Sequence, residues 1–254
     1  YSAKNIAEAI SHEVGHTVSL RHQSTYSYTP STCTKTAEYN PGQGTGVTSW
    51  APIMGVGYYK NVTVWYNGTS AQNCNLIQYD HANASTGITG PGRLNFRTDD
   101  VGNTAATAEI LNLNNLNLAD SGLITEPSDV DVYKFTICNT RYVTVDVKPW
   151  ALDTNLNSYQ GANLDLRLFL YNSSNNLLAV DSPLTKLNAR IGMTLNAGTY
   201  HFLIDGGGSG NYSDYGSIGR YYLKVKATNP PQMTNTIVLP QTALCSGQPV
   251  QLNY

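Results

Sequence analysis

The stretches "DVDVYKFTI" (residues 129–137) and "YVTVDVKP" (142–149) decide the fold of the larger part of this 254-residue chain. In both, apolar and polar residues alternate, which is the pattern of β-strands with one buried face. The pattern recurs in "LDLRLFLYNSSNN" (164–176) and "GTYHFLIDGGG" (198–208), with Gly, Asn and Ser at the ends. The sequence therefore predicts an antiparallel β-sandwich over residues 98–228.

Residues 1–97 begin with a helical pattern around "SHEVGHTVSLRHQS" (11–24). Four apolar residues follow one another at a spacing of four and would form one stripe of an α-helix: Ile6, Ile10, Val14 and Val18. His12 and His16 lie only about 40° apart on the same helix, roughly opposite that stripe. We expect the stripe to face the core and the two histidines to face a site.

This histidine face is a candidate metal site. Glu13 lies beside it, where a carboxylate can reach a water molecule without becoming a ligand. His22 could not reach the same ion from a continuous helix, because six further residues carry it about 240° around the axis. The chain must therefore turn between Ser19 and Arg21 if His22 binds. A site of three histidines has two alternatives. One is a polar helix with solvated histidines, and the other is a zinc site whose third ligand is Glu38.

The segment "HEVGHTVSLRH" resembles the zinc-binding signature of the metzincin peptidases, H-E-x-x-H-x-x-G-x-x-H, with Ser19 in place of the glycine. Serine can adopt a positive φ at a cost of about 1 kcal/mol. The resemblance implies that His12, His16 and His22 bind Zn²⁺ and that Glu13 is the general base. It also implies that residues 1–97 are the C-terminal half of a metzincin catalytic domain, with further chain upstream that peptidase activity would require.

The same resemblance gives further expectations for this part. Met54 in "SWAPIMGVGYY" would form the methionine turn beneath the metal, and Tyr58 or Tyr59 would stabilise the transition state. A second helix is expected around "SAQNCNLIQYDHANA" (70–84), and His81 near its end is interpreted as a further ligand or as a solvated histidine. With this half domain and the sandwich, the expected fold class is α+β.

The four cysteines are too far apart for a zinc knuckle or a C-x-x-C redox pair. Cys33 and Cys74 bracket the methionine turn and are candidates for a disulfide, which an exported protein would allow. Cys138 follows a predicted strand and is interpreted as a small hydrophobic residue. Cys245 lies in a C-terminal tail.

Composition narrows the class of protein. Only 13% of the residues are charged and the net charge is −2, so no basic face indicates a nucleic acid partner. No apolar run approaches the roughly 18 residues that span a membrane. Abundant Asn, Ser, Thr, Gly and Tyr are typical of secreted β-rich proteins, and we expect a secreted or cell-surface location.

The predicted sandwich resembles the pre-peptidase C-terminal domain of secreted bacterial peptidases, in its Asp129 and Asp131 before an aromatic strand and in its closing "YGSIGRYYLKV". Four aspartates either form a calcium site or are ordinary turn formers, and we favour the turn formers. They are Asp129, Asp131, Asp165 and Asp205. Residues 229–254 read as a Pro-rich linker and the start of a further domain that resembles immunoglobulin-like repeats.

Together these features predict a secreted zinc metalloendopeptidase that acts on protein or peptide substrates, with other domains of the same polypeptide as partners. The alternative is a non-catalytic adhesion or carbohydrate-binding surface protein with a vestigial zinc site. The intact Glu13 argues against that alternative, because loss of the base is the simplest way to inactivate such a site.

Overall fold

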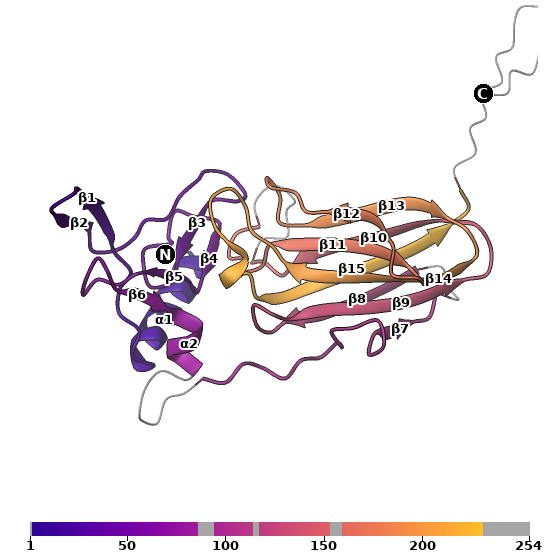
Figure 1. Cartoon of the computed structure of the whole chain (residues 1–254), viewed down its shortest axis with the longest axis horizontal. Coiled ribbons are helices and arrows are strands. Elements are labelled where there is room, and N and C mark those ends of the chain that lie inside the picture. The colour runs from indigo at the N-terminus through magenta and orange to yellow at the C-terminus, as the bar shows by residue number, and fades with distance from the viewer. Residues whose placement is uncertain (1, 86–93, 114–116, 153–158, 231–254) are drawn as a thin grey trace, which may run out of the picture.

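The computed structural model describes residues 2–85, 94–113, 117–152 and 159–230, which form two parts along the long axis of the molecule (Figure 1). The first part, from the N-terminus, holds α1 and α2, and the second is built from long strands. Within the described ranges there are two α-helices, of 15 and 6 residues, against fifteen strands. The α+β class was therefore wrong, because the described chain is predominantly β.

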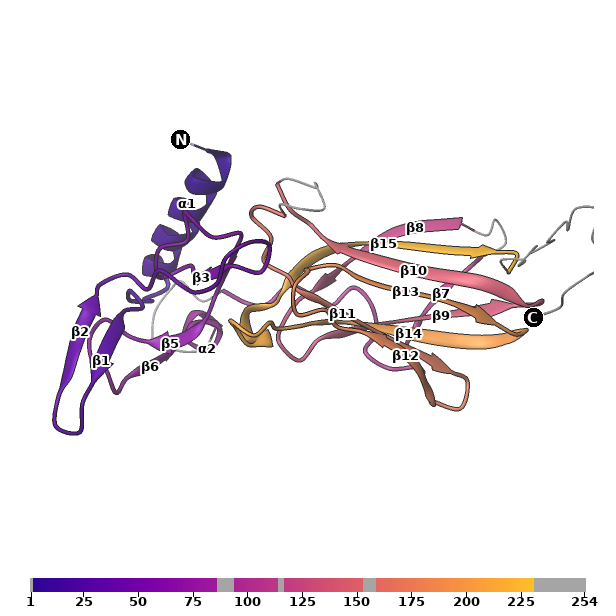
Figure 2. The same cartoon turned by 90° about the horizontal axis from the view of Figure 1, so that it is seen from above.

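The second part is a sandwich of two sheets, seen edge-on in Figure 2. The four-stranded sheet has the order β13-β10-β15-β8, from Ala189–Leu195, Arg141–Pro149, Gly219–Thr228 and Asn117–Ile124. The five-stranded sheet has the order β12-β11-β14-β9-β7, from Leu177–Asp181, Leu166–Asn172, Gly198–Gly206, Val130–Ile137 and Glu109–Leu111. The pairs are antiparallel except β7 with β9, which is parallel.

Alternation in the sequence explains the sandwich. Tyr133 and Phe135 of β9 turn inward, as do Val143, Val145 and Val147 of β10, and all five are buried in one core between the sheets. Residues at period two share a face of a strand, so every second side chain leaves water. The predicted antiparallel sandwich agrees with the structure. A short 3-10 helix, η1 (Asp214–Gly216), lies in the loop before β15.

The first part begins with α1 (Ala3–Thr17), whose first turn is capped by the Ser2 hydroxyl accepting from Asn5 N at 3.2 Å. Short strand pairs follow: β1 (Thr25–Tyr28) with β2 (Cys33–Ala37), β3 (Trp50–Pro52) with β4 (Val62–Val64), and β5 (Asn67–Thr69) with β6 (Ile77–Tyr79). The helix α2 covers only Asp80–Ser85.

These strands replace the long loop and second helix that the sequence predicted for a half metzincin domain. Over residues 70–84, the expected helix is mostly a turn and a strand. Asn73 explains part of this difference, because its Oδ1 accepts from Asn75 N at 2.9 Å and thereby favours a turn over a helix. The half-domain interpretation is therefore not supported by the secondary structure.

The apolar stripe of α1 does not face the core. Ile6, Ile10 and Val14 are 51%, 60% and 40% exposed, and Val18 alone of the four is buried. The helix packs on the rest of its part through Lys4, which donates to Gly57 O at 2.9 Å, and through Gly15. Within the described chain the stripe therefore faces a core only at Val18.

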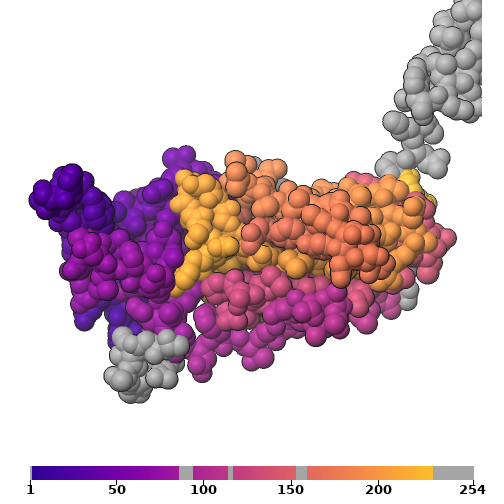
Figure 3. Space-filling view, viewed as in Figure 1, coloured from indigo at the N-terminus to yellow at the C-terminus, as the bar shows by residue number. Residues whose placement is uncertain are grey.

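The two parts share a small core and hydrogen bonds, among them Gly161 N donating to Asn61 O at 3.1 Å. Buried residues of the first part (Trp50, Val62 and Val64) pack with Ala151, Tyr159, Ala162, Leu187 and Tyr212 of the second. Asn163 Nδ2 also donates to Thr63 O at 2.6 Å. In the space-filling view, the segment before β15, coloured toward yellow, lies directly against the first part (Figure 3). The sandwich and the histidine helix thus belong to one packed unit.

Two expectations on single segments remain. Cys138 is exposed and unpaired rather than packed as a small hydrophobic residue, because β9 ends one residue before it. The tail from residue 231, with Cys245, lies outside the described residues. Neither described helix has the length and apolar character needed to cross a membrane.

Candidate functional site

The structure brings His12, His16 and His22 together at the end of α1. Their ring centroids are 4.9 Å apart for His12 and His16, 5.3 Å for His12 and His22, and 4.9 Å for His16 and His22. Each ring offers a nitrogen within 4.8 Å of the others. His22 reaches the group because α1 ends at Thr17 and Ser19 adopts φ 66°, where the sequence required a turn.

Hydrogen bonds orient all three rings in the same way. His12 Nδ1 lies 2.7 Å from Ile53 O, and His16 Nδ1 lies 2.9 Å from Leu20 O. Because a carbonyl oxygen only accepts, both Nδ1 atoms carry a proton, so Nε2 is the nitrogen that each ring can offer to a metal. His22 Nδ1 lies 2.8 Å from Glu38 Oε1, which favours the same tautomer. Metal-binding histidines typically make such outer hydrogen bonds, so this donor set fits Zn²⁺.

Burial also favours the neutral imidazole. Desolvation lowers the pKa of His12, only partly offset by its hydrogen bond to Ile53, and the neighbouring His16 and His22 lower it further. A protonated ring has no lone pair for a metal. A lowered pKa therefore keeps His12 available as a ligand near neutral pH.

Glu38, the alternative third ligand, is not one of the clustered ligands. It accepts from His22 with Oε1, and from Lys35 Nζ with Oε2 at 2.7 Å. The hydrogen bonds from Lys35 and His22 lower the pKa of Glu38, so it remains an acceptor. Sequence reasoning missed this role, because no local pattern relates Glu38 to a residue 16 positions earlier.

Met54 lies beneath the histidine helix, completely buried. A Cβ atom at Gly15 would overlap Met54 Sδ, so the helix approaches the methionine this closely only with glycine there. Met54 O accepts from Gln23 N at 2.8 Å, next to His22. The turn that contains Met54 thus supports both the helix and the returning chain.

A cavity of about 220 Å³ opens beside His12. Glu13 lines it together with Tyr58, whereas Tyr59 is 91% exposed and does not line it. Tyr39, which the sequence did not single out, also lines the cavity, and its ring centroid lies 4.4 Å from that of His22. The arrangement places a carboxylate and two phenols around a space large enough for a side chain.

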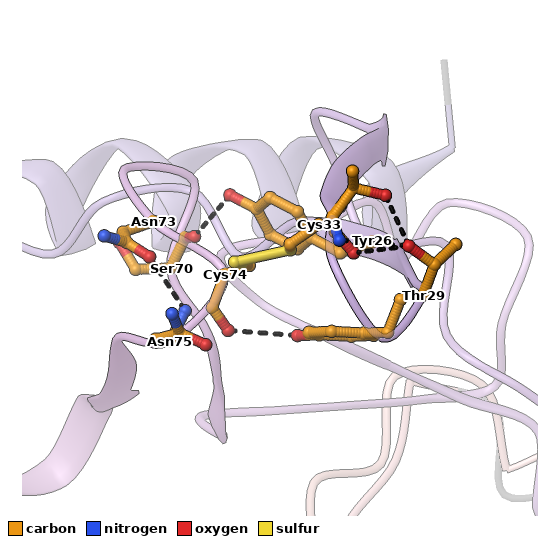
Figure 4. Close-up of a disulfide and its surroundings, with 9 residues drawn as sticks. Tyr26, Thr29, Cys33, Ser70, Asn73, Cys74 and Asn75 are labelled. Carbon is orange, nitrogen blue, oxygen red and sulfur yellow. Dashed lines mark hydrogen bonds between the residues drawn. A yellow bond between two sulfur atoms is a disulfide. The ribbon is translucent and has the colours of Figure 1, made fainter.

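A disulfide joins Cys33 and Cys74, the two cysteines that the sequence analysis named as candidates for one (Figure 4). The bond ties the start of β2 to the turn between β5 and β6. Two tyrosines of β1 reinforce the tie: Tyr26 OH donates to Ser70 O at 2.8 Å and Tyr28 OH donates to Cys74 O at 3.0 Å. The hairpin that leads to Glu38 is thereby fixed to the body of the first part.

His81 is neither solvated nor part of the histidine group. It is buried, its ring stacks on Tyr215 at 4.5 Å, and neither ring nitrogen has a hydrogen-bond partner. Burial lowers the pKa of His81 to about 4, so the ring stays neutral. The expectation of an exposed histidine was wrong because the second part of the molecule covers it.

The four aspartates of the candidate calcium site do not gather. Asp165 accepts from Tyr212 OH at 2.9 Å, Asp205 pairs with Arg167 at 2.6 Å, and Asp129 accepts from Thr125 N at 2.6 Å, as a turn former does. A different acidic group forms instead from Asp99, Asp100 and Asp131, with one oxygen of each within 4.8 Å of the others.

No family model matches the chain, and no curated protein matches it. Among solved structures, the chain is similar to the pre-peptidase C-terminal domain of collagenase from Bacillus anthracis, with 19% identity, 52% of this chain and 100% of that chain covered, and a TM-score of 0.34. It is also similar to PliG, a periplasmic inhibitor of g-type lysozyme from Aeromonas hydrophila, with 11% identity, 48% and 96% covered, and a TM-score of 0.27. Likenesses this weak assign no activity to the chain.

Proposed function

We propose that this chain carries the zinc site of a secreted endopeptidase whose active-site signature resembles that of the metzincins. One observation carries the proposal: three imidazoles from separate turns of the chain converge, each with Nδ1 hydrogen-bonded, beside a cavity lined by Glu13. His12, His16 and His22 would hold the metal through their free nitrogens.

Bound Zn²⁺ would supply a Lewis acid that polarises the substrate carbonyl and lowers the pKa of a water. Glu13 takes a proton from the attacking water while the oxygen of that water adds to the carbonyl carbon. As the carbon–nitrogen bond breaks, Glu13 delivers that proton to the leaving amine. Tyr39 and Tyr58 line the same cavity, and either phenol can donate a hydrogen bond to the substrate carbonyl oxygen.

The replacement Glu13→Gln tests the proposal. The amide keeps the shape of the side chain and cannot take a proton, so we expect unchanged zinc content with peptide hydrolysis lowered by about 100-fold or more. Metal analysis and a fluorogenic peptide assay measure the two quantities in a chain extended upstream, with Glu109→Gln, an exposed carboxylate of β7, as a control that leaves the base and the histidine group in place. Full hydrolysis by zinc-loaded Glu13→Gln would contradict the general-base role. A zinc-loaded chain extended upstream that hydrolyses no peptide would favour the non-catalytic surface protein.

The disulfide supports a secreted or cell-surface location, because such bonds persist in oxidising compartments. In this proposal the sandwich is the accessory module that its sequence resemblance implies, and substrates are proteins or peptides.

Calcium binding becomes a proposal for the group of Asp99, Asp100 and Asp131. Asp131 is fully buried, and its Oδ1 has no hydrogen-bond partner, as a ligand oxygen would. Added Ca²⁺ should raise the melting temperature of the wild type and leave that of Asp131→Asn unchanged. Equal shifts in both proteins would contradict this site.

A further inference from the structure

His22 differs from the other two histidines in how it is held. His12 and His16 project from α1, whose backbone hydrogen bonds fix their positions. His22 lies in the irregular chain between the end of α1 and β1, so its position depends on contacts from elsewhere. His22 itself contacts Glu38 through its ring and accepts from Ala71 N at 2.8 Å, and its neighbours Arg21 and Gln23 make the further contacts.

Gln78 holds the backbone of Arg21. Its Oε1 accepts from Arg21 N at 2.8 Å, and its Nε2 donates to Arg21 O at 2.8 Å. The two bonds run in opposite directions, as between paired strands, and they fix the chain immediately before His22. Gln78 is buried, so water does not compete for either bond.

Asp80 in turn orients Gln78 and Gln23. Its Oδ1 accepts from Gln78 Nε2 at 2.9 Å and from Gln23 Nε2 at 3.0 Å, and its Oδ2 accepts from Tyr66 N at 2.9 Å. Because Oδ1 is the acceptor in both side-chain bonds, it draws the NH₂ end of each amide toward itself. The oxygen of Gln78 must then face Arg21 N. One buried carboxylate therefore fixes the amides on both sides of His22.

Burying the carboxyl group of Asp80 costs desolvation free energy, which its hydrogen bonds must offset. The side chain is fully buried, and desolvation raises the pKa of Asp80 to about 7 even though three donors surround it. Two of those donors belong to the side chains that flank or hold the segment of His22. The carboxylate thus acts where the third ligand is positioned.

We propose that Asp80, acting through Gln78 and Gln23, is a positioning residue that holds His22 in place for the metal, an inference that rests on the proposed zinc site. The buried polar group Asp80, Gln78 and Gln23 is then part of the site's function rather than of the general core. A change in this polar group should alter the contribution of His22 to zinc affinity and leave the contributions of His12 and His16 unchanged.

The test is a pair of double-mutant cycles on zinc affinity, measured by competition with a chelator. Gln78→Met keeps the size of the side chain and removes both bonds to Arg21, so we expect zinc affinity to fall about 10–100-fold. In the Gln78→Met background, His22→Ala should lower zinc affinity little further, since His22 is already misplaced. His12→Ala should cost as much as it does in the wild type. Asp80→Asn should show the same selective loss through His22.

Val62→Ala is the matched control, because it opens the buried core of the same part without touching the group around Asp80. Its zinc affinity should equal that of the wild type even where its melting temperature falls. Equal costs of His22→Ala in both backgrounds, or a loss of affinity in Val62→Ala as large as in Gln78→Met, would overturn the positioning role alone. A wild-type chain that binds no Zn²⁺ would instead overturn the proposed function.

Discussion

Ser19 carries the backbone conformation that returns the chain to the histidine group. Its φ is 66°, and the bonds around it form a helix-ending motif: Ser19 N donates to His16 O at 3.0 Å and Leu20 N donates to Gly15 O at 3.0 Å. Leu20, just beyond the turn, is buried. The hydrogen bonds and this burial offset the roughly 1–2 kcal/mol that a left-handed conformation costs a residue with a Cβ atom.

We therefore expect replacements at Ser19 to depend on backbone freedom. Ser19→Val should lower the free energy of unfolding by about 1–2 kcal/mol, because a β-branched residue strongly disfavours positive φ. Ser19→Gly should match or exceed the wild type. Urea unfolding of the metal-free chain measures both, with Thr17→Val, in the helical turn before it, as the control. A Ser19→Val protein as stable as the wild type would show that the turn carries no strain.

At the scale of elements, the β1–β2 hairpin depends on its attachment to the rest of the first part. An isolated two-stranded hairpin is marginally stable in water. Here the disulfide and the hydroxyl group of Tyr26 anchor it to the segment around β5 and β6 (Figure 4). The hydroxyl group of Tyr28 adds a bond to Cys74 O. Because β2 leads directly to Glu38, the hairpin also sets the partner of His22.

Replacing Cys33 and Cys74 together by serine should lower the free energy of unfolding by about 2–4 kcal/mol, since the unfolded chain gains the freedom of a long loop. Zinc affinity should also fall, because the hairpin that carries Glu38 is released. Urea unfolding and chelator competition measure the two effects. Cys138→Ser, at an exposed free cysteine, is the control and should change neither. Unchanged stability of the double variant would refute the anchoring role.

For the whole molecule, the buried carboxyl groups set the dependence of stability on pH. Burial raises the pKa of Asp165 from its usual 3.8 to about 7, and the Tyr212 hydrogen bond lowers it only in part. Between these values the folded chain keeps a proton that the unfolded chain has lost. The stabilisation is thus complete below about pH 4 and disappears as the pH rises through 7.

We accordingly expect the melting temperature to fall between pH 5 and pH 8, and to fall less in Asp165→Asn, whose amide does not titrate. Scanning calorimetry across this range measures the difference. Asp120→Asn, at an exposed position, serves as the control and should follow the wild type. A steeper decline in Asp165→Asn than in the wild type would contradict the raised pKa.

The shared core between the two parts gives a prediction for the sandwich by itself. Residues 98–228 contain the whole core between the two sheets, so they should fold alone and melt cooperatively. They should melt at a lower temperature than the full chain, because Tyr159 and Tyr212 lose Trp50, Val62 and Val64 as neighbours. Circular dichroism decides this, and a disordered spectrum would disprove independent folding.

The sequence by itself determined the features that arise within a few residues. Alternation defined the strands of the sandwich, the spacing of His12 and His16 placed both on one helix face, and the reach of His22 required a turn where Ser19 has positive φ. Each follows from the period of a helix or a strand, which acts locally. The candidate site was predictable to that extent.

Only the tertiary structure decided the rest. Residues 70–84 carried a helical interpretation, yet pairing with β5 made part of them a strand. Glu38 and Asp80 gained their roles from partners 16 and 57 residues away, and the burial of His81 came from the sandwich. No local pattern encodes such contacts, because the packing of distant segments brings these residues together and overrides local propensity.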